Sequence, residues 1–159
     1  MTDNNSLETF VDLSAALTGF PPKTIAPPLD PTNLKQLYFD KMNAEMHDEL
    51  AEMSNIYKQI VGSQPLNPDL AQQVANEILN NQTLFNAAQA LLRLWYLGSW
   101  SQTSGDESSI VSQEAYTNSL VWRTIQAHPM GYSTFHYGHW GEQPPSLENF
   151  VGTWSKNGW

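Results

Sequence analysis

The sequence has 159 residues, of which 40% are hydrophobic and 14% charged, and its formal net charge is −9. This length and composition indicate one folded domain with its own core, and the acidic balance excludes a nucleic-acid or anionic-membrane surface, because both need clustered lysines and arginines. The absence of cysteine excludes disulfides and thiolate sites, and no apolar run approaches the roughly 20 residues of a membrane span.

The N-terminal half contains two predicted helices separated by a proline-rich connector. The first helix is expected to begin at Ser6, which can act as its N-cap, and to end at Gly19. Residues 20–29 contain four prolines and are expected to be extended. Asp30-Pro31 then predicts the start of one long helix to about Val61. Its apolar stripe consists of Leu34, Tyr38, Met42, Met46, Leu50, Met53, Tyr57 and Ile60.

The flanks of this long helix are expected to face solvent, because acidic side chains crowd them. These acids are Asp40, Glu45, Asp48, Glu49 and Glu52, and His47 is expected to be a surface residue among them.

Three further helices are predicted in the second half. Asn67-Pro68 caps a short amphipathic helix, and residues from about Thr83 to Leu97 form an apolar helix that is expected to be central. A polar loop over residues 99–109 leads to a fifth helix, capped by Ser112 and running to about Ala127. The residues of this fifth helix that are expected to face inward are Tyr116, Leu120, Val121, Thr124 and Ile125.

Helical periodicity dominates, and no pair of alternating strands is found. The sequence therefore predicts an all-α fold: a small bundle of about five helices over residues 1–127. A long, irregular, aromatic-rich C-terminal arm follows over residues 128–159, with one more short turn near residues 146–151. The arm is expected to pack on the bundle and on a partner subunit, so that the chain forms a single domain.

The C-terminal arm offers one candidate metal site. His128, His136 and His139 lie within twelve residues, and imidazoles are common ligands of zinc and iron. However, glycines and prolines interrupt the segment, so no helix sets the spacing of these side chains. The favoured interpretation is therefore that these histidines form hydrogen bonds and pack against neighbouring side chains. The alternative is a metal-dependent enzyme or binding protein that uses all three histidines as ligands.

Other chemistry has little support in the sequence, and no catalytic, cofactor-binding or metal-binding residues are predicted. There is no G-x-S-x-G elbow and no G-x-G-x-x-G fingerprint. Arg93 and Arg123 stand among apolar residues, where each could bind a carboxylate but is expected to form an ion pair. A stand-alone sugar-binding module is a third interpretation, weakened because the aromatic side chains lack neighbouring Asp, Asn or Arg pairs.

Partner binding is the favoured interpretation, because Trp, Tyr, Phe, Met and Arg are enriched at the centres of protein interfaces. Packing in the chain's own core is an equal alternative for Trp95, Tyr96 and Trp122. The predicted partner-binding residues are Trp95, Tyr96, Trp100, Trp122, Arg123, His128, Pro129, Met130, Tyr132, Phe135, Tyr137 and Trp140.

Several segments also carry a family resemblance, strongest from about Leu91 to Pro145: LWYLGSW at 94–100, VSQEAY at 111–116, LVWRTIQAHPMGY at 120–132, GHW at 138–140 and PP at 144–145. FVDLS at 10–14 and LTG at 17–19 fit the same pattern. The chain resembles the small (gamma) subunit of membrane-bound FAD-dependent sorbitol dehydrogenases, which is similar to the small subunits of FAD-dependent glucose, gluconate and fructose dehydrogenases.

The resemblance implies a small subunit without a cofactor of its own. In the family, FAD and the catalytic histidine belong to a large subunit of the glucose–methanol–choline type, and a multihaem cytochrome c subunit with haem c receives the electrons. The small subunit supports folding, stability and export of the large one, often through a twin-arginine signal. The expected location is the periplasmic face of the inner membrane. Since no such signal precedes Ser6 in the sequence, the cytoplasm is the alternative.

Overall fold

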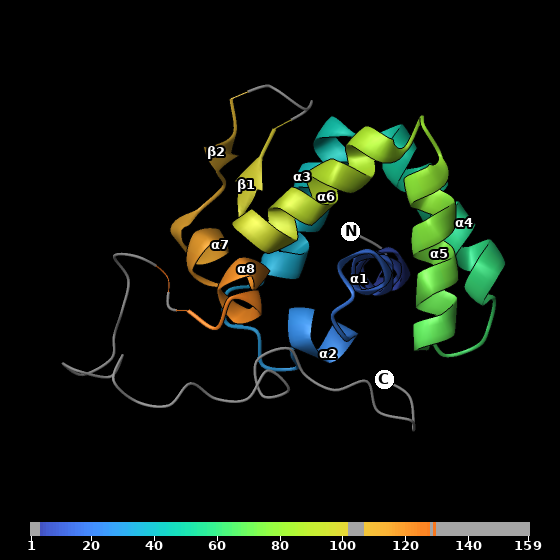
Figure 1. Cartoon of the computed structure of the whole chain (residues 1–159), viewed down its shortest axis with the longest axis horizontal. Helices are drawn as coiled ribbons and strands as arrows, with labels where there is room; N and C mark the ends of the chain where they lie inside the picture. Colours follow the sequence, from blue (N-terminus) through green and yellow to red (C-terminus); the bar gives the residue numbers. More distant parts are fainter. Residues whose placement is uncertain (1–3, 102–106, 128, 130–159) are drawn as a thin grey trace.

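Helix α1 (Asn4–Thr18) packs against the five helices that follow it in the chain, whereas the last two helices lie to one side of the fold (Figure 1). The computed structural model describes residues 4–101, 107–127 and 129. Phe10, Leu13 and Ala15 on α1 are almost completely buried. The helix begins at Asn4, two residues before the predicted cap at Ser6.

The proline-rich connector is not wholly extended, so that prediction was wrong in part. A single helical turn, α2 (Pro22–Ile25), forms within it and buries Pro22 and Ile25. Pro22 stands at the start of this turn, where the fixed φ of proline suits a helix and its missing N–H costs nothing.

The predicted long helix is two helices, α3 (Leu34–Glu45) and α4 (His47–Val61). Met46 separates them with φ −142° and ψ 52°, outside the helical region. The break allows α3 to pack on α1 and α6, and α4 to pack on α1 and α5. One straight helix could not reach both sides of α1. The apolar stripe nevertheless faces the core, since Tyr38, Met42 and Met53 are buried.

The start of the predicted long helix was also wrong, because Asp30 forms a turn rather than a helix cap. Its Oδ1 accepts hydrogen bonds from the backbone N–H groups of Thr32 and Asn33, at 3.1 and 2.9 Å. Helix α3 begins only after Asn33, which adopts a left-handed conformation with φ 49°. The prediction for the flanking acids is confirmed, since Asp40, Glu45, Asp48 and Glu52 are exposed and Glu49 is half-buried.

The next two helices agree with prediction. Helix α5 (Pro68–Asn80) is capped by Asn67, whose Oδ1 accepts from Leu70 N at 3.0 Å. Helix α6 (Phe85–Leu97) crosses the bundle, buries Leu91 and Leu94 completely, and ends at Gly98 in a left-handed conformation.

The segment after α6 differs from the prediction in two ways. Two-residue strands β1 (Ser99–Trp100) and β2 (Ser109–Ile110) pair antiparallel at the ends of the predicted loop. They are too short to show alternation in the sequence. The predicted fifth helix is two short helices, α7 (Gln113–Thr117) and α8 (Leu120–Thr124), although Ser112 caps the first as expected, accepting from Ala115 N at 3.0 Å.

The break between α7 and α8 changes which side chains face the core. Leu120 is buried as expected, but Thr124 and Ile125 are exposed, contrary to prediction. Residues 118–119 are not helical, so the inward positions of α7 do not continue into α8 at helical spacing.

The predicted all-α class is confirmed for the described part of the chain. No helix in this part is both long enough and apolar enough to span a membrane. The predicted arm over residues 128–159, including its short turn near 146–151, lies outside the described residues except for Pro129.

Candidate functional site

Two of the predicted partner-binding residues lie in the chain's own core. Trp95 is 4% exposed, and its ring meets that of Tyr38 edge to face, with centroids 4.8 Å apart. Trp100 is 8% exposed, and Lys41 Nζ lies 5.3 Å from its ring centroid. Both indoles are therefore mostly buried by other residues of this chain. A partner subunit would contact mainly other side chains.

Tyr96 connects α6 to the end of α1. Its hydroxyl donates to the backbone oxygen of Thr18 at 2.8 Å, and its ring meets Phe20 edge to face with centroids 6.0 Å apart. Burial raises the pKa of the Tyr96 hydroxyl. The half-buried Tyr96 side chain thus stabilises the packing of α6 against the end of α1.

Trp122 and Arg123 on α8 lie closer to the surface. Trp122 is half-buried, and its Nε1 donates to the backbone oxygen of Tyr116 at 2.8 Å. Arg123 is exposed, and Pro129 is half-buried. The remaining predicted partner-binding residues lie outside the described residues: His128, Met130, Tyr132, Phe135, Tyr137 and Trp140.

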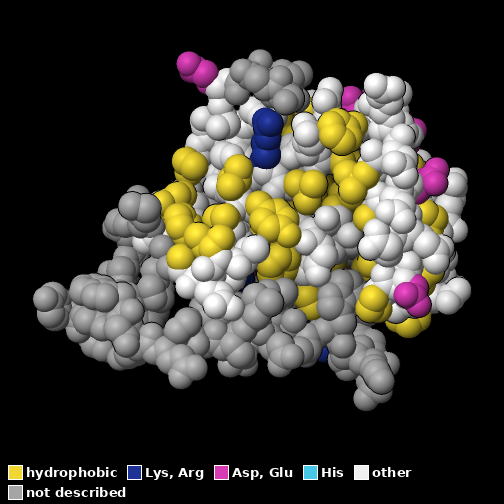
Figure 2. Space-filling model, viewed as in Figure 1, with side chains coloured by type: hydrophobic (Ala, Val, Ile, Leu, Met, Phe, Trp, Pro, Cys, Tyr) yellow, Lys and Arg dark blue, Asp and Glu magenta, His cyan; other side chains and the backbone are white. Residues whose placement is uncertain are grey.

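Exposed hydrophobic side chains gather around these residues. Leu97, Ile110 and Ile125 are 46%, 54% and 57% exposed. They stand on α6, on β2 and just after α8; α7 packs on both α6 and β2, and α8 packs on α6. We call these three, with Tyr116 and Trp122, the apolar face. Figure 2 shows hydrophobic side chains gathered on the side of the molecule where β2, α7 and α8 lie.

The charge of the chain is concentrated away from the apolar face. Residues 34–80 carry seven acids and three lysines, whereas the described residues from 85 to 127 carry only Arg93, Arg123, Glu107 and Glu114. The region of the apolar face is therefore electrically neutral and has few groups to desolvate. Leu97 and Ile110 are aliphatic, so the aromatic enrichment that predicted the interface does not include them. Ile125 was expected to face inward because one continuous helix was predicted.

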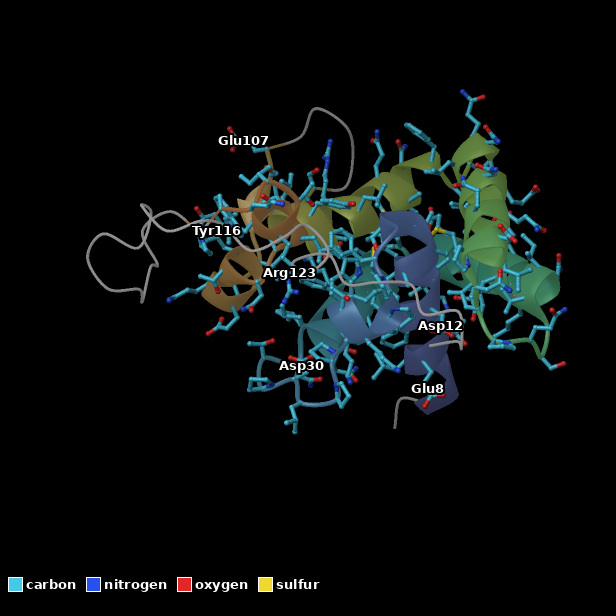
Figure 3. All side chains as sticks on the ribbon, turned by 60° about the horizontal axis from the view of Figure 1, so that its bottom comes forward. Glu8, Asp12, Asp30, Glu107, Tyr116 and Arg123 are labelled. Carbon is cyan, nitrogen blue, oxygen red and sulfur yellow. The ribbon has the colours of Figure 1, made fainter. Side chains whose placement is uncertain are left out.

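The most strongly perturbed acid in the described residues joins α1 to α4. Tyr57 Oη donates to Asp12 Oδ2 at 2.8 Å. Burial raises the pKa of the Asp12 carboxyl, the hydrogen bond from Tyr57 opposes this rise, and the charge of Glu8 adds to it. Burial, together with the neighbouring Asp12, also raises the pKa of Tyr57. Figure 3 shows Glu8 and Asp12 along the same helix.

This pair joins α1 to α4. A groove of about 400 Å³ beside it is lined by Leu7, Val11 and Lys35, among others. A carboxyl and a neutral phenol that hydrogen-bond each other are typical of a structural contact between helices.

The described residues contain no cluster of three or more metal-ligating acids and histidines. The alternative metal site of His128, His136 and His139 lies wholly outside them. His47 is an exposed residue, as expected, with Nδ1 2.9 Å from Asn43 Oδ1. Arg93 donates to the hydroxyl of Ser101.

Comparison of the sequence with known protein families shows to which family the chain belongs. The sequence model of the membrane-bound FAD-containing D-sorbitol dehydrogenase family matches residues 1–144. The chain belongs to this family. No curated protein and no solved structure matches it. The match confirms the resemblance drawn from residues 91–145 and makes the chain a subunit of an FAD-containing sorbitol dehydrogenase.

Proposed function

We propose that this sorbitol dehydrogenase subunit is non-catalytic and that it binds and stabilises a large subunit that carries FAD and performs the oxidation. The observation that supports this most directly is the apolar face. Exposed Leu97, Ile110 and Ile125 and the half-buried Trp122 belong to a part of the chain that carries fewer charges than residues 34–80. Apolar, aromatic and charge-depleted surfaces are typical of the centres of protein interfaces.

The pockets in the described part of the chain support the placement of FAD in a partner subunit. Dinucleotide sites need a glycine-rich turn that brings backbone N–H groups and a helix N-terminus to the pyrophosphate. The pockets of about 200, 400 and 220 Å³ in the described part of the chain are lined by no glycine. We therefore assign FAD to the partner subunit.

The C-terminal arm belongs to the same proposal. The aromatic side chains and histidines of residues 128–140 extend the contact with the large subunit. The histidines form hydrogen bonds and pack against neighbouring side chains rather than binding a metal. A cytochrome c subunit with haem c is the further partner that the family resemblance implies. The periplasmic face of the inner membrane is the location we propose, with assistance in folding and export of the large subunit as an additional role.

Purification of the tagged chain from its native source tests this function. We expect a flavin-containing dehydrogenase subunit to co-purify in stoichiometric amount, with sorbitol-oxidising activity in the complex. Sorbitol oxidation by the isolated chain, or a bound flavin in it, would contradict the assignment of the chemistry to a partner.

A further inference from the structure

The loop between α2 and α3 carries the most exposed of the large hydrophobic side chains in the described part of the chain. Leu29 is 90% exposed, whereas the other exposed side chains of this kind lie between 37% and 57%. A leucine at this exposure makes little contact with its own chain, so it contributes almost nothing to the core. Figure 3 shows Asp30, the next residue of the loop, at the edge of the molecule.

The sequence around Leu29 restricts the backbone of the loop. Three of the five residues 27–31 are prolines, whose rings fix φ. Asp30 is restricted as well, because it precedes a proline. Leu29 is therefore the one residue of this segment that is neither a proline nor followed by one.

Hydrogen bonds and buried side chains hold the loop at both ends. Asp30 Oδ1 accepts from the backbone N–H groups of Thr32 and Asn33 at 3.1 and 2.9 Å, and from the Thr32 hydroxyl at 2.7 Å. Ile25 before the loop and Leu34 after it are both buried in the core. The tip of the loop is therefore held in place before any partner binds.

An exposed leucine on a restricted loop is suited to insertion into the surface of a partner. Burial of the side chain removes apolar surface from water, which favours association. A loop that is already ordered loses little conformational entropy on binding, so more of this gain remains as affinity. An aliphatic anchor that fills a pocket of the partner is a common element of protein interfaces.

The loop lies next to the helix that carries part of the apolar face. Leu29 lines a pocket of about 200 Å³ together with Leu120 and Arg123 of α8. Trp122 of the apolar face stands on the same helix, and Ile125 directly follows it. One partner surface laid across α8 can therefore contact both the loop and the apolar face.

The charge of the chain argues against two other occupants. A second copy would bring together two molecules that each have a net charge of −9, and such molecules repel each other. The anionic headgroups of a bilayer would repel the chain for the same reason. An apolar pocket in a partner protein meets neither obstacle.

We propose that Leu29 inserts into an apolar pocket of the FAD-containing large subunit and that the proline-rich loop over residues 27–31 holds it ready for this contact. The inference rests on the proposed function. It adds to the interface a second contact, which is distant in the sequence from the apolar face and lies on the other side of α8 from none of its partners' reach: both contacts border the same helix.

A competition assay tests the anchor, in which variants of the full chain displace a labelled copy of the original chain from the native complex. Leu29→Ala removes most of the side chain, and we expect it to bind roughly tenfold more weakly because less apolar surface is buried. Leu29→Met keeps an apolar side chain of similar volume and should bind within about threefold of the original chain. Since Leu29 is exposed, the melting temperature should change little in either variant.

Leu79→Ala is the matched control for the truncation. Leu79 is exposed on α5, outside both the loop and the apolar face. This variant should bind within about twofold of the original chain, as expected of a surface substitution away from a contact. Thermal unfolding of every variant shows whether the fold is intact.

Pro28→Gly tests whether the loop positions the anchor. Glycine frees φ at this position, so the loop must be ordered when the partner binds, and we expect affinity to fall by about threefold. In a chain that already carries Leu29→Ala, the same substitution should have almost no further effect. An equal loss in both backgrounds would contradict the positioning role of the loop.

The outcomes separate this inference from the proposed function. If Leu29→Ala competes normally while Ile125→Asp competes poorly, the anchor is wrong and the docking function stands. The inference is also overturned if Leu29→Ala leaves the affinity for the large subunit unchanged but abolishes dimerisation of the chain, or its binding to vesicles of phosphatidylethanolamine and phosphatidylglycerol. If the unaltered chain does not compete for a place in the complex, both proposals fail.

Discussion

Trp122 is held in place by Tyr116: its Nε1 donates to the Tyr116 backbone oxygen at 2.8 Å, and the two rings meet edge to face with centroids 5.4 Å apart. The two short helices α7 and α8 are thereby joined. The contact also fixes an indole at the surface beside Ile125. A large, rigid aromatic side chain loses little entropy when a partner covers it, so this pair is the best-defined part of the apolar face.

Introducing charge on the apolar face should weaken the complex without unfolding the chain. We expect Ile125→Asp and Ile110→Asp each to reduce affinity for the large subunit about tenfold or more, because the buried carboxylate would lack a partner. Both positions are more than half exposed, so the melting temperature should change little. Binding measurements and thermal unfolding on the same samples check the two effects.

Leu79→Asp is the control for these substitutions. Leu79 is 37% exposed on α5, among the acidic helices rather than on the apolar face. Equal weakening by Leu79→Asp would show that the loss of affinity reflects net charge rather than the location of the contact.

Removal of the arm should have a larger effect on the complex than on the bundle. A chain ending at His128 keeps every described helix, and we expect it to fold while losing co-purification with the large subunit. Circular dichroism and a pull-down measure the two properties. Retained co-purification of the shortened chain would place the contact on the bundle alone.

Gly98 is the glycine whose replacement should cost most. It adopts φ 62°, and a Cβ there would overlap the backbone of Ala115 at the start of α7. We expect Gly98→Ala to destabilise the chain by about 2 kcal/mol or more, from left-handed strain plus displacement of α7. Chemical denaturation measures this free energy.

Gly19→Ala and Gly62→Ala provide matched comparisons. Both glycines have positive φ, but a Cβ at either position would meet open space. They should therefore cost only the backbone strain, roughly 1 kcal/mol for Gly19→Ala and about 1–3 kcal/mol for Gly62→Ala, because the ψ of Gly62 is −128°, outside the left-handed helical region. Three equal losses would argue against the close approach of Gly98 to Ala115.

The Asp12–Tyr57 contact predicts a pH dependence of stability. Because burial raises the pKa of Asp12 in the folded chain, the folded state holds the proton more tightly than the unfolded state does. This contribution is fully present below the ordinary aspartate pKa of about 3.9 and is lost as the pH rises through the raised folded value. Asp12→Asn removes the titration but keeps an oxygen that accepts from Tyr57.

The free energy of unfolding of Asp12→Asn, relative to the original chain, should therefore increase as the pH rises from about 3.5 to 7. Urea denaturation of both proteins across this range provides the comparison. A difference that stays constant or decreases with pH would contradict the raised pKa of Asp12.

The extent to which the sequence predicts the fold depends on how local the signals are. Asn67 and Ser112 cap helices as expected, because capping involves only the next three residues. The break at Met46 has no comparable local signal. Met46 itself continues the apolar stripe, and the break goes with a change of neighbours, since α3 packs on α1 and α6 whereas α4 packs on α1 and α5.

The candidate site was predictable only in part for a related reason. Aromatic enrichment correctly directed attention to residues 95–123, but the sequence cannot distinguish an indole in the core, such as Trp95, from one near the surface, such as Trp122. Asp30 and Trp95 line the same pocket although they are 65 positions apart in the sequence. Their presence in one pocket is a property of the tertiary structure alone.

Co-expression of the large subunit with and without this chain tests the central claim most directly. We predict that the large subunit is soluble, loaded with FAD and active toward sorbitol only when the chain is present, and that Ile125→Asp reduces all three properties together. A large subunit that is equally soluble, FAD-loaded and active without the chain would contradict the proposed role.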